Sequence, residues 1–130
     1  MAYFLAAAAV ASTFNLVCSG EVKSFGGGEA GSEPFEKIYR VDLDSGKWCE
    51  GECPEQKPLA KVTGTSLTLE DELTEGATSR TERMSMVSRE TGEFVSKSII
   101  LGSYGKLSLY YSGQCEAAPF SGFPEFETKF

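Results

Sequence analysis

The stretch MSMVSRETGEFVSKSIILGSYGKLSLYYSGQC, residues 84–115, decides the fold of this chain. It contains three runs rich in Val, Ile, Phe and Tyr, separated by breaks at residues 89–92 and 102–105. Each break contains a glycine, which can adopt the positive φ of a tight turn without a steric penalty. Short apolar runs between such turns are typical of antiparallel strands. The stretch therefore predicts a β-meander of three strands.

Strand signals continue on the N-terminal side of this meander. Residues 35–43 (FEKIYRVDL) alternate between two faces and are followed by a turn at residues 44–47 (DSGK) and a second run through Trp48. That order is typical of a hairpin. Residues 14–25 are also strand-like, whereas the glycine-rich residues 26–32 (GGGEAGS) predict a flexible connection.

Residues 66–73 (SLTLEDEL) predict a further strand, with Leu67, Leu69 and Leu73 facing inward and Asp71 as the one charged residue on that face. The sequence as a whole predicts an all-β fold, a mainly antiparallel up-and-down meander of about seven or eight short strands that forms a barrel or a strongly curved sheet. A chain of 130 residues is long enough for one core, so a single domain is expected.

Composition excludes several classes of function. The net charge of −7 argues against nucleic-acid binding, because such proteins need a basic surface for the phosphates. The chain contains no histidine. Ser-His-Asp and Cys-His catalysis are therefore excluded, and the commonest zinc ligand is missing. We expect neither a cofactor nor a catalytic residue of these types, and a non-enzymatic role is favoured.

The first residues predict export. Residues 1–11 carry no charge and end in Ala9-Val10-Ala11, which matches the small-x-small pattern of a signal cleavage site. The alternative is a buried apolar helix or strand. The run is shorter than the roughly 20 apolar residues of a membrane span. We therefore predict a signal segment at 1–11, a single β domain at 12–130, and a periplasmic or secreted location.

Four cysteines strengthen the export prediction. An even number of cysteines in an exported chain is typical of disulfides. Three connectivities are possible, and we favour Cys18–Cys115 with Cys49–Cys53, because the first ties the opening strand to the closing one and the second is a local clip. A four-cysteine zinc site is disfavoured because only one cysteine pair is tightly spaced. A redox role is disfavoured because the spacing is Cys-x3-Cys.

Aromatic residues are the candidates for ligand or partner binding: Tyr104, Tyr110, Phe120, Phe123 and Phe126. Two prolines in the tail, residues 116–130 (EAAPFSGFPEFETKF), make a helix unfavourable there. The tail is expected either to fold back and pack over the sheet, where it covers an open edge or the end of a barrel, or to dock as an extended arm on a partner.

Carboxylates offer a second kind of candidate site. A carboxylate on the inner face of a strand, as predicted for Asp71, is a candidate general acid, although a solvated acidic face is favoured. The residues around Gly46 lack most of the ligands of a calcium loop, so no metal site is predicted.

Several short motifs give the chain a family resemblance. They are FNLVCSG at 14–20, YRVDL at 39–43, GKWC at 46–49, GQC at 113–115 and PF at 119–120. In these the chain resembles small exported bacterial β-proteins to which no activity is assigned, so the resemblance implies no site residues.

The leading functional hypothesis is an exported, non-enzymatic binding module for a small apolar ligand or a protein surface. One alternative is a carboxylate-dependent enzyme around Asp71. Another is an outer-membrane or envelope structural protein, since Phe126-x-Thr128-x-Phe130 loosely resembles the aromatic end of an outer-membrane strand. The short, polar runs argue against the latter.

Overall fold

The computed structural model describes residues 11–103 and 105–124. It contains nine strands: β1 (Thr13–Gly26), β2 (Glu29–Asp42), β3 (Lys47–Glu50), β4 (Lys57–Pro58), β5 (Lys61–Val62), β6 (Ser66–Glu75), β7 (Arg80–Ser88), β8 (Glu93–Gly102) and β9 (Gly105–Ala118). Every pairing is antiparallel. The all-β, antiparallel fold predicted from the sequence is confirmed. Within the described ranges no helix is long and apolar enough to cross a membrane.

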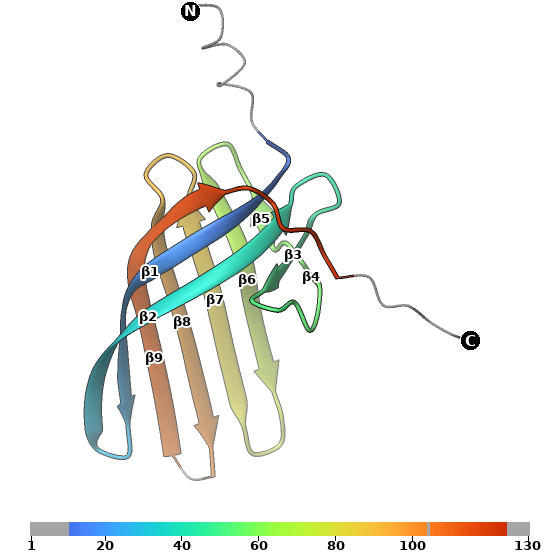
Figure 1. Cartoon of the computed structure of the whole chain (residues 1–130). Coiled ribbons are helices and arrows are strands. Elements are labelled where there is room, and N and C mark those ends of the chain that lie inside the picture. Colours follow the sequence, from blue (N-terminus) through green and yellow to red (C-terminus); the bar gives the residue numbers. More distant parts are fainter. Residues whose placement is uncertain (1–10, 104, 125–130) are drawn as a thin grey trace, which may run out of the picture.

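The strands form one strongly curled sheet, a half-barrel, in the order β4-β3-β2-β1-β9-β8-β7-β6-β5 (Figure 1). The first and last strands pair in the middle of this order, and the open side of the half-barrel lies between β4 and β5. Residues 59–60 cross that side. The Leu59 N–H donates to the carbonyl of Gly46, and the Ala60 N–H donates to the carbonyl of Thr68. This link holds the two edges of the sheet near each other.

The long hairpin of β1 and β2 differs from the sequence prediction. Register runs without a break to Gly26↔Glu29, so the turn contains only Gly27 and Gly28. Both have positive φ, 58° and 81°, which is the backbone of a two-residue hairpin turn. The prediction of a flexible connection over 26–32 is therefore wrong, because two glycines are sufficient for the reversal and β2 continues through the others.

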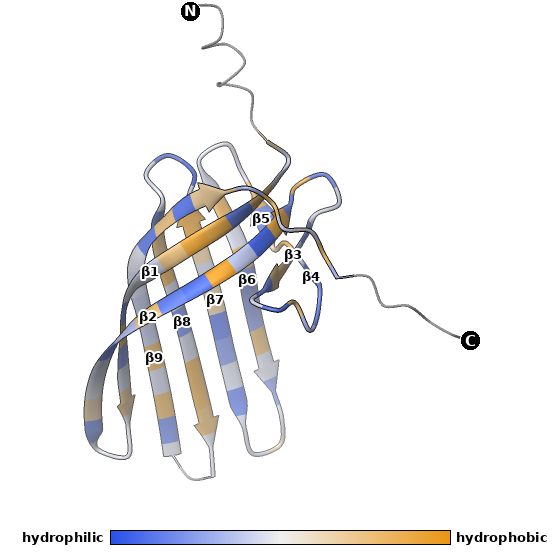
Figure 2. Cartoon of the chain, viewed as in Figure 1, coloured by the Kyte–Doolittle hydropathy of each residue, from blue (hydrophilic) through white to orange (hydrophobic). Residues whose placement is uncertain are grey.

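Alternating residues of the long strands build a core on the inner face of the half-barrel. Figure 2 shows the corresponding alternation of hydrophobic and hydrophilic residues along several strands. Phe94 on β8 is fully buried, and its ring centroid lies 5.8 Å from those of Phe35 and Tyr39 on β2. These contacts cross the interior between strands that are not neighbours in the sheet. The two walls of the half-barrel are thus packed against each other at this level.

A β-bulge in β6 changes which side chains face inward. The pairing with β7 shifts between Thr68 and Glu70, so the buried Leu69 has no directly opposite partner. One extra residue inverts the alternation beyond it. Glu70 consequently lies on the inner face, whereas Asp71 and Leu73 are exposed. The predicted inward positions of Asp71 and Leu73 are therefore wrong.

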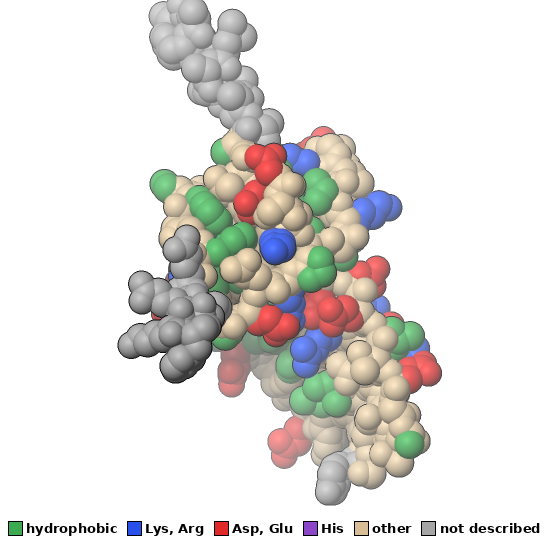
Figure 3. Space-filling view, turned by 90° about the vertical axis from the view of Figure 1, so that its right-hand side faces the viewer, with side chains coloured by type: hydrophobic (Ala, Val, Ile, Leu, Met, Phe, Trp, Pro, Cys, Tyr) green, Lys and Arg blue, Asp and Glu red, His purple; other side chains and the backbone are tan. Residues whose placement is uncertain are grey.

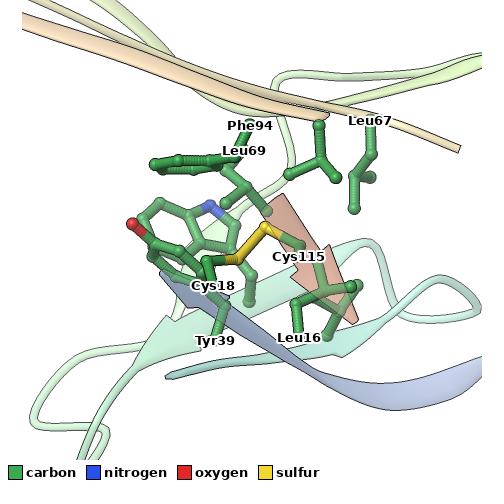
Figure 4. Close-up of a cluster of buried hydrophobic side chains, with 10 residues drawn as sticks. Leu16, Cys18, Tyr39, Leu67, Leu69, Phe94 and Cys115 are labelled. Atoms are coloured by element: carbon green, nitrogen blue, oxygen red, sulfur yellow. A yellow bond between two sulfur atoms is a disulfide. The ribbon is translucent and has the colours of Figure 1, made fainter. Parts of the chain in front are cut away.

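Two disulfides join Cys18 to Cys115 and Cys49 to Cys53, the connectivity that the sequence favours. Cys18 and Cys115 are directly opposite in the pairing of β1 with β9, with Cα atoms 3.9 Å apart. Figure 4 shows this disulfide inside the cluster of buried side chains that contains Leu16, Tyr39 and Phe94. It therefore belongs to the core and fastens the two central strands of the sheet.

A close approach of β1 and β9 gives a first prediction. Gly20 and Gly113 are paired, and a Cβ on Gly113 would lie 2.0 Å from the backbone oxygen of Ser19. Backbone atoms cannot give way as a flexible side chain does. We expect Gly113→Ala to lower the free energy of unfolding in urea by about 3 kcal/mol. Gly64→Ala is the control, because a Cβ there meets nothing within 4 Å. Equal stability of the two variants would contradict this contact.

Candidate functional site

A cavity of about 360 Å³ lies on the concave side of the sheet, next to the core. We call it the inner cavity. Its walls combine aromatic rings, both signs of charge and hydroxyl groups; they are Lys37, Tyr39, Trp48, Glu50, Pro54, Glu55, Lys57, Glu70, Arg83, Ser85, Ser96, Lys97, Ser98, Leu109 and Tyr111. Viewed from the side that carries β3 to β5, acidic and basic side chains gather next to one another in the middle of the face (Figure 3).

The cavity exists because small polar residues follow the core residues along β7 and β8. Val87 and Phe94 are paired and buried, and the next inward pair is Ser85 with Ser96. The two serine hydroxyl oxygens are 2.8 Å apart, so they satisfy each other. Ser98 continues the same face. These side chains are too small to fill the width of the half-barrel, and a space remains beyond the core.

The wall formed by β3, β4 and β6 is organised around Lys57. Its Nζ lies 3.5 Å from Oε1 of Glu70 and 5.5 Å from the ring centroid of Trp48. The Trp48 indole N–H donates to the carbonyl of Pro58 at 3.2 Å, which fixes the ring plane. The lysine is therefore held between a carboxylate and an aromatic face.

The neighbouring strand β2 repeats this arrangement with Lys37. Its Nζ is 3.8 Å from Oε1 of Glu50 and 4.4 Å from the ring centroid of Tyr111. Lys37 precedes the buried Tyr39 by two residues, so it shares the inner face of the strand. Two lysine–carboxylate pairs with aromatic neighbours thus face the same space.

Glu70 is the most unusual member of the site. Its Oε1 is buried and has no hydrogen-bond partner among the described residues, because the contact with Lys57 at 3.5 Å does not meet hydrogen-bond geometry. A buried acceptor without a donor costs about 1–3 kcal/mol, and such groups are few in folded proteins. The site therefore contains an acceptor that can be satisfied by a donor from outside the chain.

Tyr39 presents a neutral phenol to the same region. Its pKa is raised far above the usual value, first by burial and then by the neighbouring carboxylate of Glu50, with smaller contributions from Tyr111 and Glu70. The phenol consequently keeps its proton at any physiological pH and can donate a hydrogen bond.

The raised pKa of Tyr39 predicts a specific loss of stability in alkali. Above pH of about 10 the unfolded chain releases this proton and the folded chain keeps it, so the free energy of unfolding falls as pH rises. Urea unfolding between pH 8 and 11 should show a shallower decline for Tyr39→Phe than for the wild type. Tyr110→Phe, which changes an exposed tyrosine, is the control. Identical slopes for all three proteins would contradict the burial of the phenol.

Three of the five aromatic residues predicted from the sequence, Tyr110, Phe120 and Phe123, do not line the inner cavity. Tyr110 is on the outer face, 41 % exposed, and forms an edge-to-face pair with Phe25 at 6.0 Å. Phe120 and Phe123 form another pair at 5.3 Å in the tail. Tyr104 and Phe126 lie outside the described residues. The structure therefore does not bring Tyr110, Phe120 and Phe123 together into one site.

The described part of the tail is fastened to the outer side of the sheet, where it crosses β1 and β2 (Figure 1). Asn15 Nδ2 donates to Oγ of Ser121 at 3.0 Å, and Arg40 Nη1 donates to the carbonyl of Gly122 at 2.8 Å. Asn15 and Arg40 are themselves paired across the two strands. Over residues 119–124 the tail thus folds back on the sheet, as the first expectation has it, but its contacts with Asn15 and Arg40 hold it on β1 and β2 and not on the edge strands β4 and β5.

Most residues of the inner cavity were missed by the sequence analysis. A signal was present in residues 35–43, where Lys37 is in phase with the inward-facing Tyr39 and Val41. Arg83 is likewise in phase with Ser85. Charged residues in phase with buried ones mark the point at which a core ends and a polar interior begins. Such a pattern does not reveal which strands face one another, so it could not have assembled the site.

Two further hollows lie away from the inner cavity. One of about 500 Å³ is lined largely by apolar residues including Phe14, Leu67 and Val87, at one end of the half-barrel. The other, of about 690 Å³, is an open groove beside Phe25 and Tyr110 on the outer face. Among residues 11–103 and 105–124, no group of three or more acidic or cysteine side chains could hold a metal ion.

A curled β half-barrel with disulfides suggests an extracellular binding module. Its two disulfides are consistent with an oxidising, extracytoplasmic location. Comparison of the chain with models of known protein families, with curated proteins and with solved structures finds no match.

Proposed function

We propose that the protein is an exported, non-enzymatic binding module that holds a small molecule in the inner cavity. The observation that carries this proposal is the buried Oε1 of Glu70, which lacks a hydrogen-bond donor in a cavity with aromatic walls. Its volume of about 360 Å³ falls within the usual range of small-molecule sites, roughly 300–1,000 Å³. A bound donor group would remove the cost of the unsatisfied oxygen.

The chemistry of the walls favours a polar ligand over the small apolar one expected from the sequence. Charged side chains lie on both walls, and an apolar molecule would desolvate them without replacing their hydrogen bonds. The aromatic rings supply the flat apolar surface that a polar molecule with an apolar side also needs. A periplasmic or secreted location, after removal of residues 1–11, completes the proposal.

The carboxylate-enzyme hypothesis loses support from the position of Asp71. This residue is exposed and does not line the inner cavity. It is paired with Met84 of β7, and both side chains lie on the face of the sheet away from the cavity. Of the carboxylates that do line the walls, Glu50 and Glu70 each lie beside a lysine, whereas Glu55 has no ion-pair partner among the described residues. Such pairs suit binding, since they present fixed charges to a ligand.

Native mass spectrometry of the exported, oxidised protein tests this function. The protein is incubated with a mixture of small polar and small apolar compounds, and retained compounds are identified by mass. We expect a retained polar compound. Ser98→Phe, which fills the cavity, should abolish retention, whereas Ser112→Phe, which adds the same ring at an exposed position, should preserve it. Equal retention by both variants would place binding outside the inner cavity.

A further inference from the structure

Two charged residues that line the inner cavity are exposed to solvent and form no ion pair with the described residues. Of the charged groups that line it, Lys37, Lys57 and Lys97 each form an ion pair. Arg83 and Glu55 have no such partner among the described residues. The cavity thus offers one cationic and one anionic group, in addition to the unsatisfied oxygen of Glu70.

Arg83 is placed to receive an anion. It lies opposite Glu72 in the pairing of β6 with β7, yet no carboxylate oxygen of the described residues lies within 4.0 Å of its guanidinium. Its planar fork of N–H donors matches a carboxylate or a phosphate, which it can bind through two parallel hydrogen bonds. The neutral phenol of Tyr39 and the hydroxyl of Ser98 are further donors in the same cavity.

Glu70 is placed to accept a hydrogen bond from a second donor, beside the Lys57 ammonium that lies 3.5 Å from its Oε1. It is directly opposite Ser85 in the register, and Arg83 is two residues from Ser85 on the same strand face. Such diagonal neighbours have Cα atoms about 7–8 Å apart. An acceptor and a cationic donor therefore project from diagonally neighbouring positions of one wall, where a compact molecule with both an ammonium and a carboxylate group can contact both side chains.

From this arrangement, which rests on the proposed function of the cavity, we propose that its ligand is a small zwitterion of the α-amino acid type. The ammonium group donates to Oε1 of Glu70, and the carboxylate accepts from the guanidinium of Arg83. The remainder of the molecule lies against Leu109 and the Tyr111 ring, which provide the apolar part of the wall. A molecule with only one of the two charges leaves either the oxygen of Glu70 or the Arg83 cation without a partner.

The test uses the full exported chain, labelled with ¹⁵N and titrated with pools of the twenty standard α-amino acids. The tightest binder is then compared with its amide, which lacks the carboxylate, and its N-acetyl derivative, which lacks the ammonium. We expect each derivative to bind at least ten-fold more weakly than the parent amino acid.

Variants assign the two contacts. Arg83→Gln should weaken binding of the amino acid at least ten-fold and leave binding of its amide unchanged. Glu70→Gln should weaken binding of the amino acid and its amide but not of the N-acetyl derivative. Arg80→Gln is the matched control, since Arg80 lies next to Glu75 and does not line the cavity. Thermal unfolding of each variant verifies that it is folded.

The outcomes separate this inference from the proposed function. Equal binding of the amino acid and its two derivatives, or no binding of any amino acid at 10 mM, overturns the proposal that the ligand is a zwitterion. If Ser98→Phe still abolishes retention of some other compound, the cavity remains the binding site and only the ligand class is wrong. If Ser98→Phe has no effect on any retained compound, the proposal that the cavity binds a small molecule is overturned as well.

Discussion

Replacing both Cys18 and Cys115 by alanine is expected to lower the free energy of unfolding by about 4–5 kcal/mol. The two residues are separated by 97 positions, so the disulfide closes a loop that includes most of the chain. Closing so long a loop strongly restricts the unfolded state. The sulfur atoms also belong to the core, where Cys18 is fully buried. Guanidinium unfolding without reductant measures this loss directly.

The second disulfide provides the matched comparison. Cys49 and Cys53 are four positions apart, and the same loop-closure argument gives only about 2 kcal/mol for their joint replacement by alanine. Both double variants lose two buried sulfur atoms, so the difference between them reports mainly loop length. If the Cys49/Cys53 variant is as unstable as the Cys18/Cys115 variant, the larger stabilisation expected from the disulfide between β1 and β9 is contradicted.

Phe94→Ala should lower the free energy of unfolding by about 3–5 kcal/mol. The ring is fully buried, and its contacts with Phe35 and Tyr39 join the two walls of the half-barrel. Removing it leaves a void that the flanking strands can fill only by moving together. Val95→Ala, at the adjacent position with a side chain 37 % exposed, should cost less than about 1 kcal/mol. Urea unfolding that ranks the two variants equally would contradict the packing across the interior.

Much of the fold could be predicted because it depends on local signals. The turns before β8 and β9 and the hairpin of β2 and β3 each follow from a glycine between alternating runs. Gly46, Gly92 and Gly105 all have positive φ, as such turns require. The disulfide pairing followed from a simple argument, that one bridge ties the first strand of the chain to the last and the other is a local clip.

The inner cavity could not be predicted, for two physical reasons. A single extra residue in β6 moved Asp71 to the outside and Glu70 to the inside, and the sequence of β6 shows no break at that point. In addition, the walls come from strands that are distant in the chain, such as β2 and β8, and alternation does not specify how far a sheet curls. The ion pair of Lys57 with Glu70 depends on that curl.

The open edges of the sheet are protected against pairing with other chains. Only residues 39–42 of β2 pair with β3, which leaves the rest of that edge free. This free stretch contains Pro34, which lacks an N–H, and several glutamates. The outermost strands β4 and β5 have only two residues each. Proline, charge and short edge strands are the usual means of preventing edge-to-edge aggregation, so the sheet can keep an open concave face while its edges stay unpaired.

The most direct test of the binding cavity is a ¹H–¹⁵N correlation spectrum of the protein recorded with and without the compound retained in the mass spectrometric experiment. The chain contains one tryptophan, and its indole N–H lies in a wall of the inner cavity. We predict saturable shifts of the Trp48 indole signal and of the amides of Tyr39, Ser96 and Tyr111. Shifts confined to the outer-face residues Phe25 and Tyr110 or to the tail, with an unchanged Trp48 signal, would contradict the account.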